Sequence, residues 1–376
     1  MATTASTPAG IASPTPGPRN DITDVAGISV GHHQRIGRGW LTGTTVVVPP
    51  PGTTASVDVR GGAPGTRDTD LLDPRAAVAA VDAICLTGGS AYGLAATDGV
   101  MAHLASLGRG FAVGPRPHEV VPIVPSAVIF DLGRAGNFAN RPDASFGRLA
   151  TIAALRRRRP LTGLAHGVVG AGTGARAGGL KGGIGSASVI VDGITVGALV
   201  VVNAAGSCVE QRSGALLGAR TLLPGELAWL RTPTRADVRA ATDALAEQLA
   251  IRRARNESLA RNTTLAVIAT DAQLAKSECH KLAGVGHDGL ARAISPIHLM
   301  VDGDICFALA TGTHPIAGSD TTAFADADSR TARFDRLLAA AADAVTRAVV
   351  HAALNATSVG EIVSYSDLYP SAVRHR

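Results

Sequence analysis

The sequence predicts an α+β fold built from packed layers of helices and strands. Short apolar runs typical of buried strands occur along most of the chain, together with longer segments whose apolar residues recur at helical spacing. The two kinds do not alternate strictly, which favours α+β layers over a doubly wound parallel sheet. The chain has 376 residues, 46% hydrophobic and 17% charged. This is a globular composition, large enough for one big domain or two closely packed halves.

The chain begins with a segment of low complexity. Residues 1–20 are mainly Ala, Thr, Ser and Pro, so we expect a disordered tail followed by a single domain over residues 21–376. Short apolar runs then predict six strands, at residues 44–48, 83–86, 188–191, 196–202, 264–270 and 306–311. Three prolines end the first of these runs, and Asp192-Gly193 predicts a hairpin between the third and the fourth.

Four segments predict helices. The first follows the glycine pair at 88–89, and the second begins at a capping box over 234–237. The third covers 273–293, and the fourth is a long Ala-rich helix over about 330–354. We expect the second helix to turn four apolar side chains inward: Val238, Ala241, Leu245 and Leu249.

Charge and cysteine content argue against several classes of partner. The net charge is only +5 and aromatic residues make up 3%, so we expect no nucleic-acid partner. The one dense basic cluster, at 156–159, is better explained as a solvated helix end before Pro160. The cysteines lie far apart, without metal-ligand spacing, and no apolar run has the length of a membrane span. We therefore expect no metal, no membrane partner and a cytoplasmic protein.

Two glycine-rich motifs suggest binding sites. GAGTGA at 170–175 matches a dinucleotide fingerprint, but the residues after it are too rich in glycine for the helix that such a site needs. We expect no cofactor there, and instead an active-site loop that carries Lys181. GGSAYG at 88–93 resembles a hydrolase nucleophile elbow around Ser90, yet Tyr92 stands where that motif needs glycine. A plain strand-to-helix turn is the better interpretation.

Asp302 and Asp304, in the motif VDGD, are candidate site residues. In a strand the two carboxylates would point to one face beside the apolar run ICFALA, where each needs a partner. An Asp-Gly turn explains the same residues equally well. The spacing leaves both interpretations open.

The junction Asn262-Thr263 suggests a specific chemistry. A polar stretch ends at Asn262, and a buried strand begins directly after Thr263. Threonine with a free α-amine combines a nucleophile and a base in one residue, so a chain cut here would gain an N-terminal nucleophile. A mere linker before a strand is the alternative.

Taken together, these motifs resemble those of the DmpA-type self-processing aminopeptidases. That group includes L-aminopeptidase/D-esterases, β-peptidyl aminopeptidases and nylon-oligomer hydrolases. The matching segments span nearly the whole chain after residue 20: 58–72, 83–100, 121–132, 170–188, 196–206, 262–272 and 302–312. The resemblance implies a four-layer αββα sandwich of the N-terminal-nucleophile hydrolase type, similar in architecture to ornithine acetyltransferase. It also implies self-cleavage into residues 1–262 and 263–376.

The resemblance also implies the site residues. Thr263 corresponds to the nucleophile, Asp302 and Asp304 to the paired acids, Lys181 to the family lysine and Asn203 to the family asparagine. We expect Asp302 to orient Thr263, with Asp304 supporting Asp302. In the substrate pocket, where we also place Tyr92, the tyrosine of some members is replaced by Phe130.

The implied activity is an aminopeptidase or amidase without a cofactor. It would cleave small peptides or amino-acid amides through an acyl-enzyme on Thr263. Acyl transfer of the ornithine acetyltransferase type, endo-hydrolysis of nylon oligomers and a non-enzymatic binding role are the alternatives. We expect a homo-oligomer, with a tetramer implied by the resemblance. The Ala-rich last helix supports this because it has more apolar surface than one core needs.

Overall fold

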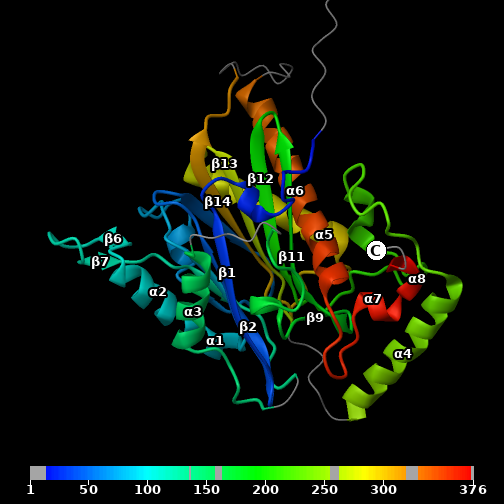
Figure 1. Cartoon of the computed structure of the whole chain (residues 1–376). Helices are drawn as coiled ribbons and strands as arrows, with labels where there is room; N and C mark the ends of the chain where they lie inside the picture. The colour runs from blue at the N-terminus through cyan, green and yellow to red at the C-terminus, as the bar shows by residue number, and fades with distance from the viewer. Residues whose placement is uncertain (1–13, 135–136, 157–162, 255–261, 319–328, 374–376) are drawn as a thin grey trace, which may run out of the picture.

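Two five-stranded sheets packed face to face form the centre of the protein, and helices cover both outer faces (Figure 1). A computed structural model describes residues 14–134, 137–156, 163–254, 262–318 and 329–373. One apolar core lies between the two sheets. Each sheet also has a core of its own between its outer face and the helices that cover it. The predicted four-layer αββα sandwich is confirmed.

The first sheet combines five strands from the N-terminal part of the chain. Its strands, in spatial order, are β1 (Ser29–Gly37), β2 (Trp40–Val48), β5 (Ile84–Thr87), β8 (Ser126–Val128) and β4 (Thr66–Arg67). All neighbours are antiparallel except β5 and β8. Two helices cover its outer face: α2 (Ala96–Ser106) and α3 (Ala144–Ala154). The short α1 (Ser90–Gly93) precedes α2, so the helix predicted after the glycine pair is split in two.

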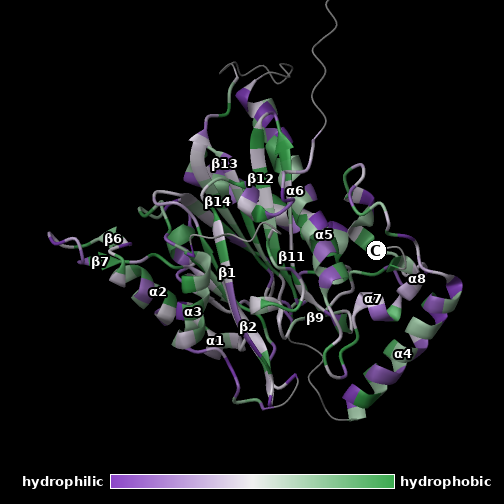
Figure 2. Cartoon of the chain, viewed as in Figure 1, coloured by the Kyte–Doolittle hydropathy of each residue, from purple (hydrophilic) through white to green (hydrophobic). Residues whose placement is uncertain are grey.

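The second sheet combines strands from both ends of the chain. Its strands, in spatial order, are β11 (Gly183–Val191), β12 (Ile194–Val202), β13 (Leu265–Ala272), β14 (Ile305–His314) and β3 (Thr54–Val59). Only β13 and β14 are parallel. Two long helices cover its outer face: α5 (Lys276–Ala293) and α6 (Arg330–Asn355). Because both faces of the sheet are covered, its central strands such as β12 are largely apolar (Figure 2).

Smaller elements connect and flank these layers. The short strands are β6 (Phe111–Ala112), β7 (Val120–Val121), β9 (Arg176–Ala177) and β10 (Leu180–Lys181). The remaining helices are α4 (Arg235–Ala254), α7 (Tyr365–Leu368) and α8 (Pro370–Val373), together with the 3-10 turns η1 (Ile22–Asp24), η2 (Asp70–Leu72), η3 (Gly170–Gly172) and η4 (Leu217–Thr221). The predicted hairpin joins β11 to β12 at Asp192 and Gly193. Both have positive φ, of 51° and 77°, as a two-residue hairpin turn requires.

The structure differs from the sequence prediction at the N-terminal tail. Residues 1–13 lie outside the described residues, but residues 14–20 are placed against the second sheet. Thr15 pairs with Ile190, and the Asn20 side chain bonds Glu226 and Arg347. The Ala/Thr/Pro composition suggested disorder because it shows none of these contacts with distant parts of the chain.

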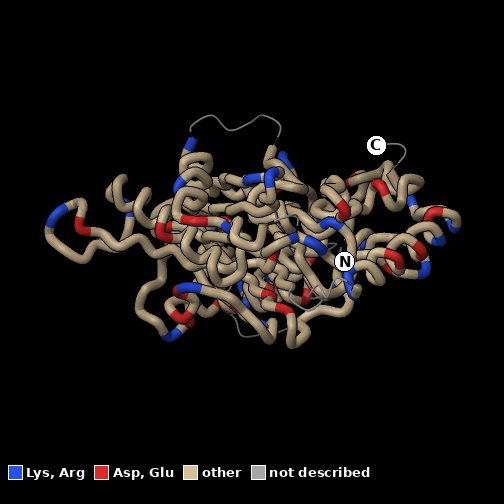
Figure 3. The backbone as a smooth tube through the Cα atoms, turned by 90° about the horizontal axis from the view of Figure 1, so that it is seen from below, with Lys and Arg blue, Asp and Glu red and all other residues tan. Residues whose placement is uncertain are grey.

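Two helices also differ from prediction. Of the four side chains expected to be buried on α4, only Ala241 is fully buried, while Leu249 is 37% exposed. Figure 1 shows α4 extending away from the sandwich, and Figure 3 shows charges of both signs along it. In contrast, α6 is long and apolar enough to cross a membrane, yet 89% of that apolar stretch is buried inside the protein. Its apolar surface is therefore used by the core, which removes our sequence argument for an oligomer.

Candidate active site

Thr263 lies where three neighbouring strands of the second sheet begin or end. Antiparallel β12 ends beside the start of β13, and parallel β14 starts at the same edge. Thr263 is 5% exposed, and its N–H donates to the Asn203 carbonyl at 2.7 Å. Its Oγ1 donates to the Asn262 carbonyl oxygen at 2.6 Å, and the Gly303 N–H donates to the same oxygen at 3.0 Å. Asn262 in turn pairs with Asp302.

Asp304 is the acid that contacts the segment of Thr263. It is fully buried, and its Oδ1 accepts a hydrogen bond from the Thr264 N–H at 2.6 Å. Its Oδ2 lies 3.1 Å from the backbone nitrogen and 2.9 Å from the Nδ1 of His298. The sequence analysis did not single out His298.

Asp302 has a different set of partners. It is also fully buried, and its oxygens accept hydrogen bonds from the N–H of Ala205 at 3.2 Å and of Leu299 at 3.0 Å. Burial raises the pKa of Asp302, and the nearby charge of Asp304 adds to that effect. Both acids lie before the first residue of β14, so they do not share a strand face. A simple Asp-Gly turn does not describe them either, because both carboxylates are buried and bonded to backbone N–H groups. Asp304, and not Asp302, bonds the backbone beside Thr263, whereas Asp302 was expected to orient Thr263.

Lys181 ends the short strand β10, within the glycine-rich segment where an active-site loop was expected. Its buried Nζ donates to the carbonyls of Gly172 at 3.0 Å, Ala175 at 2.9 Å and Gly182 at 2.7 Å. These three bonds use all three ammonium protons and hold the loop closed. Burial, aided by the positive charge of Arg134, lowers the pKa of Lys181 to about 7. Within the described part of the chain, no hydrogen bond joins Lys181 to the paired acids.

Asn203 is held in one orientation by two donors. Its Oδ1 accepts from the Arg176 N–H at 3.0 Å and from the Arg134 guanidinium, which also donates to the Gly174 carbonyl. Two donors on one atom identify that atom as the oxygen, so the other end of the amide is the NH₂ group. That group is buried and has no hydrogen-bond partner among the described residues. The side chain thus presents an unused donor, while its backbone carbonyl binds Thr263.

Asp131 is a third buried carboxylate that the sequence analysis missed. Its Oδ1 accepts from the Gly89 N–H at 2.7 Å, and burial raises its pKa to about 6 although Arg134 and Lys181 oppose the shift. A side chain at either Gly88 or Gly174 would collide with this carboxylate. The two glycine-rich motifs therefore converge on Asp131, and this convergence is the signal that could have identified it.

Phe130 and Tyr92, the two residues expected in the substrate pocket, differ in how exposed they are. Phe130 directly precedes Asp131 and is half-buried. Tyr92 is 55% exposed, and the Arg141 guanidinium lies 3.8 Å from its ring centre. Their role in binding substrate stays a prediction.

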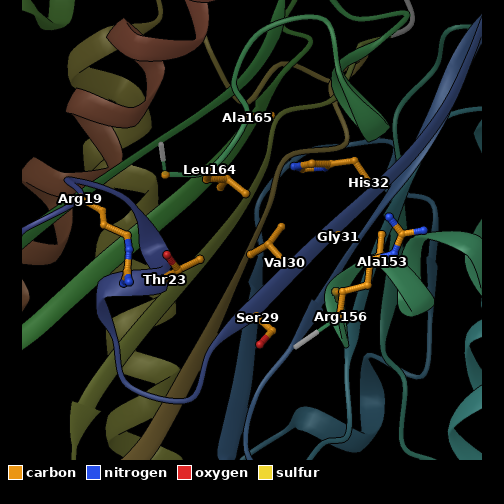
Figure 4. A pocket seen from close by; sticks show the side chains of 12 residues that line it. Arg19, Thr23, Ser29, Val30, Gly31, His32, Ala153, Arg156, Leu164 and Ala165 are labelled. Atoms are coloured by element: carbon orange, nitrogen blue, oxygen red, sulfur yellow. The ribbon is translucent and has the colours of Figure 1, made fainter. Parts of the chain in front are cut away.

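A separate cavity of about 300 Å³ lies beside β1 (Figure 4). Its lining includes Arg19, Val30, His32 and Leu164, and none of the residues that the sequence analysis proposed for catalysis. Its lining also includes Arg156 of the basic cluster, whose other residues, 157–159, lie outside the described residues. The cavity therefore lies apart from the residues grouped around Thr263.

Comparisons with known proteins indicate the family to which the chain is similar. The model of the family described as peptidase family S58 matches residues 20–364. An uncharacterized aminopeptidase of Mycobacterium tuberculosis is 49% identical over 363 residues, covering 94% of this chain and 99% of that protein. A 6-aminohexanoate-oligomer endohydrolase of Paenarthrobacter ureafaciens is 32% identical over 321 residues, covering 78% and 80%.

Solved structures show the same architecture. A Burkholderia sp. beta-aminopeptidase superposes with a TM-score of 0.66 at 25% identity, covering 97% of this chain and 96% of its own. The L-aminopeptidase D-Ala-esterase/amidase of Ochrobactrum anthropi, described as a variant of the Ntn (N-terminal nucleophile) hydrolase fold, gives a TM-score of 0.62. That match is at 21% identity and covers 96% of this chain and 95% of the other. The second match supports the fold alone.

Proposed function

Because the chain belongs to peptidase family S58, and is therefore a hydrolase of peptide or amide bonds, we propose that Thr263 is its nucleophile and that the chain cuts itself between Asn262 and Thr263. One observation carries this proposal. The Thr263 hydroxyl lies at the carbonyl group of the preceding residue, and the Gly303 N–H donates to the same carbonyl oxygen. A nucleophile and an oxyanion donor thus meet at one peptide bond.

Self-cleavage would proceed by an acyl shift. The Thr263 oxygen attacks the Asn262 carbonyl carbon, and negative charge develops on the oxygen that Gly303 binds. The bond to the Thr263 nitrogen then breaks, and the hydroxyl proton passes to that nitrogen as it becomes the free α-amine. Water hydrolyses the resulting ester, which releases the Asn262 carboxylate and restores the Thr263 hydroxyl.

Turnover would use the same groups. The α-amine of Thr263 accepts the hydroxyl proton, the oxygen attacks the substrate carbonyl, and the leaving amine takes the proton back. The unused amide donor of Asn203 can bind the developing oxyanion. Asp304 fixes the backbone next to the nucleophile, Asp302 fixes the turn beside it, and Lys181 holds the glycine-rich loop closed. Water then releases the acid from the acyl-enzyme.

The substrate we propose is a small amide or short peptide with a free amino end. The aminopeptidase relatives support this choice. Phe130 supplies no hydroxyl where some relatives have tyrosine, so the pocket should discriminate poorly among polar substrates. We expect weak, broad hydrolysis of amino-acid p-nitroanilides such as the alanine derivative, low activity on long nylon oligomers, and a shift toward the oligomers in Phe130→Tyr. Strong endo-cleavage of long oligomers by the natural sequence would refute this assignment.

Intact-mass analysis of the purified protein tests the nucleophile. The natural sequence should yield residues 1–262 and 263–376, and Thr263→Ala should stay whole and inactive. Thr313→Ala, which changes an exposed threonine at the far end of β14, should be cut and active like the natural sequence. A different cut site, or an uncut protein with full activity, would refute the proposal. Acceleration of acyl-enzyme breakdown by an added amine would identify acyl transfer instead of hydrolysis.

A further inference from the structure

We propose that His298 is a positioning residue for the nucleophile and that it acts through Asp304. This inference rests on the proposed role of Thr263. The backbone nitrogen and the ring Nδ1 of His298 both approach one oxygen of Asp304, at 3.1 and 2.9 Å. The other oxygen of Asp304 binds the Thr264 N–H at 2.6 Å. A continuous chain of hydrogen bonds therefore leads from His298 to the residue that follows Thr263.

The chemistry of Asp304 requires donors at this place. Asp304 is fully buried, and an ionised carboxylate can only accept hydrogen bonds. An ionised carboxylate buried without enough donors is strongly disfavoured. His298 supplies two of the three groups that bond Asp304, and with Asp304 ionised its Nδ1 is the protonated ring nitrogen. The ring's other nitrogen is buried and has no partner among the described residues.

The backbone of His298 is adapted to this task. Its φ is +60°, in the left-handed region that residues other than glycine rarely occupy. Asparagine, aspartate and histidine enter this region more often than other side chains, and each still pays a conformational cost there that glycine does not. Such strain persists where surrounding contacts require it. Here the conformation accompanies the convergence of the backbone N–H and the ring on a single carboxylate oxygen.

Two other elements hold the ring in place. The ring of His287, on α5, meets the His298 ring edge to face, with centroids 4.7 Å apart. His287 is fully buried, and its Nε2 lies 3.0 Å from the carbonyl oxygen of Asp58 at the end of β3. The outer helix and the edge strand therefore both support the position of His298. A residue that only filled space would not need this directed contact with the acid.

The test compares two substitutions that both accept the left-handed backbone. His298→Asn keeps a side-chain nitrogen near the place of Nδ1, whereas His298→Gly keeps only the backbone donor. We expect His298→Gly to slow self-cleavage and to lower kcat by up to about 100-fold, because a misplaced nucleophile has effects of this size. KM should change by less than about 3-fold, since the defect lies behind the nucleophile. His298→Asn should keep most of the natural rate of self-cleavage and most of the natural kcat.

The control is His280→Asn, which changes an exposed histidine on α5 whose Nδ1 lies near a backbone carbonyl. It should behave like the natural sequence. Unfolding curves identify variants that are folded, and only those are compared. Natural rates in folded His298→Gly, a change in KM alone, or His298→Asn no better than His298→Gly would each overturn the inference. If Thr263→Ala is still cut and active, the proposed function itself fails; if only the His298 variants behave normally, this inference alone fails.

Discussion

Asp131 and Lys181 are buried ionisable residues whose charges interact, and they give the folding stability a defined pH dependence. The pKa of Asp131 is raised to about 6, so between about pH 4 and 6 the folded chain keeps a proton that the unfolded chain has lost. Its contribution to the free energy of unfolding therefore falls as pH rises through that window. The pKa of Lys181 is lowered to about 7, so its contribution rises as pH increases from 7 toward 10. The two contributions together are smallest near pH 6 to 7.

Asp131→Asn should remove the decrease in the free energy of unfolding that Asp131 causes between about pH 4 and 6. The rise of the Asp131 pKa to about 6 corresponds to on the order of 3 kcal/mol for a buried group. Urea unfolding at several pH values measures this free energy. The variants carry Thr263→Ala as well, so that every sample is a single uncut chain. An unchanged slope between pH 4 and 6 would show that Asp131 does not titrate in this range.

Arg134 fixes the amide of Asn203, so its loss should weaken oxyanion stabilisation without removing the donor. Arg134→Met leaves the oxygen of Asn203 with one partner, the Arg176 N–H. Removal of a whole oxyanion donor typically costs about 10²- to 10³-fold in kcat, and we expect a smaller loss here, about 10-fold, with KM little changed. Steady-state kinetics measures this beside Asn203→Ala, with exposed Arg75→Gln as the control. An Arg134→Met enzyme with natural kcat would mean that the amide needs no such support.

The sequence identified some of these residues and missed others for a physical reason. Asn203, Thr263, Asp302 and Asp304 stand just outside strands with clear apolar patterns, so adjacent strands bring them to one edge of the sheet. No apolar pattern in the sequence indicates which residues Arg134 and His298 contact. Arg134 reaches Asn203 from 69 positions away, and the bond from His298 depends on a left-handed backbone. The contacts of Lys181 could not be predicted, because spacing does not show which acceptors a long side chain reaches.

The segment that contains the two acids packs directly against Thr263, the proposed nucleophile, and glycine is needed there. A Cβ at Gly303 would lie 2.8 Å from the Thr263 Oγ1 and 2.7 Å from the Ala63 carbonyl. Gly303→Ala should therefore displace the hydroxyl and slow self-cleavage by about 10²-fold, since displacements of about 1 Å have such effects. The fraction of cut chain over time, followed by mass spectrometry, measures the rate. Cleavage at the natural rate would contradict the packing described.

Strands and helices were predictable to different degrees. Four of the five strands of the second sheet were found because burial on both faces produces apolar runs, although β11 starts at Gly183, before the predicted residues 188–191. Strand β3, with the sequence TASVDV, has no such run and was not predicted. The helical spacing of α4 was also read correctly, but its burial was not. Periodicity shows that a helix has an apolar face, and it does not show how much of a partner surface that face meets. Leu249 on α4 and Leu337 on α6 have similar spacing signals and opposite burial.

The surface of the whole molecule changes the basis for the predicted homo-oligomer. Since α6 is buried, the exposed apolar side chains of the β6–β7 hairpin are the better candidates for an interface. Phe111, Val113 and Val121 are 53%, 63% and 42% exposed, and Figure 1 shows the hairpin extending from the sandwich. We expect light scattering at micromolar concentration to give a multiple of the chain mass, and Phe111→Lys with Val113→Lys to reduce it. A monomer mass for the natural sequence would refute the prediction.

The two pieces expected after self-cleavage should stay together, because the cut falls between strands of one sheet. β13 and β14 would belong to residues 263–376, yet β12 flanks one and β3 the other, both from residues 1–262. Separation would break both ladders and expose the apolar faces buried between the sheets. Gel filtration in native buffer should therefore give one peak containing both pieces, and guanidinium should be needed to separate them. A smaller piece that elutes alone in native buffer would show that the sheet does not hold across the cut.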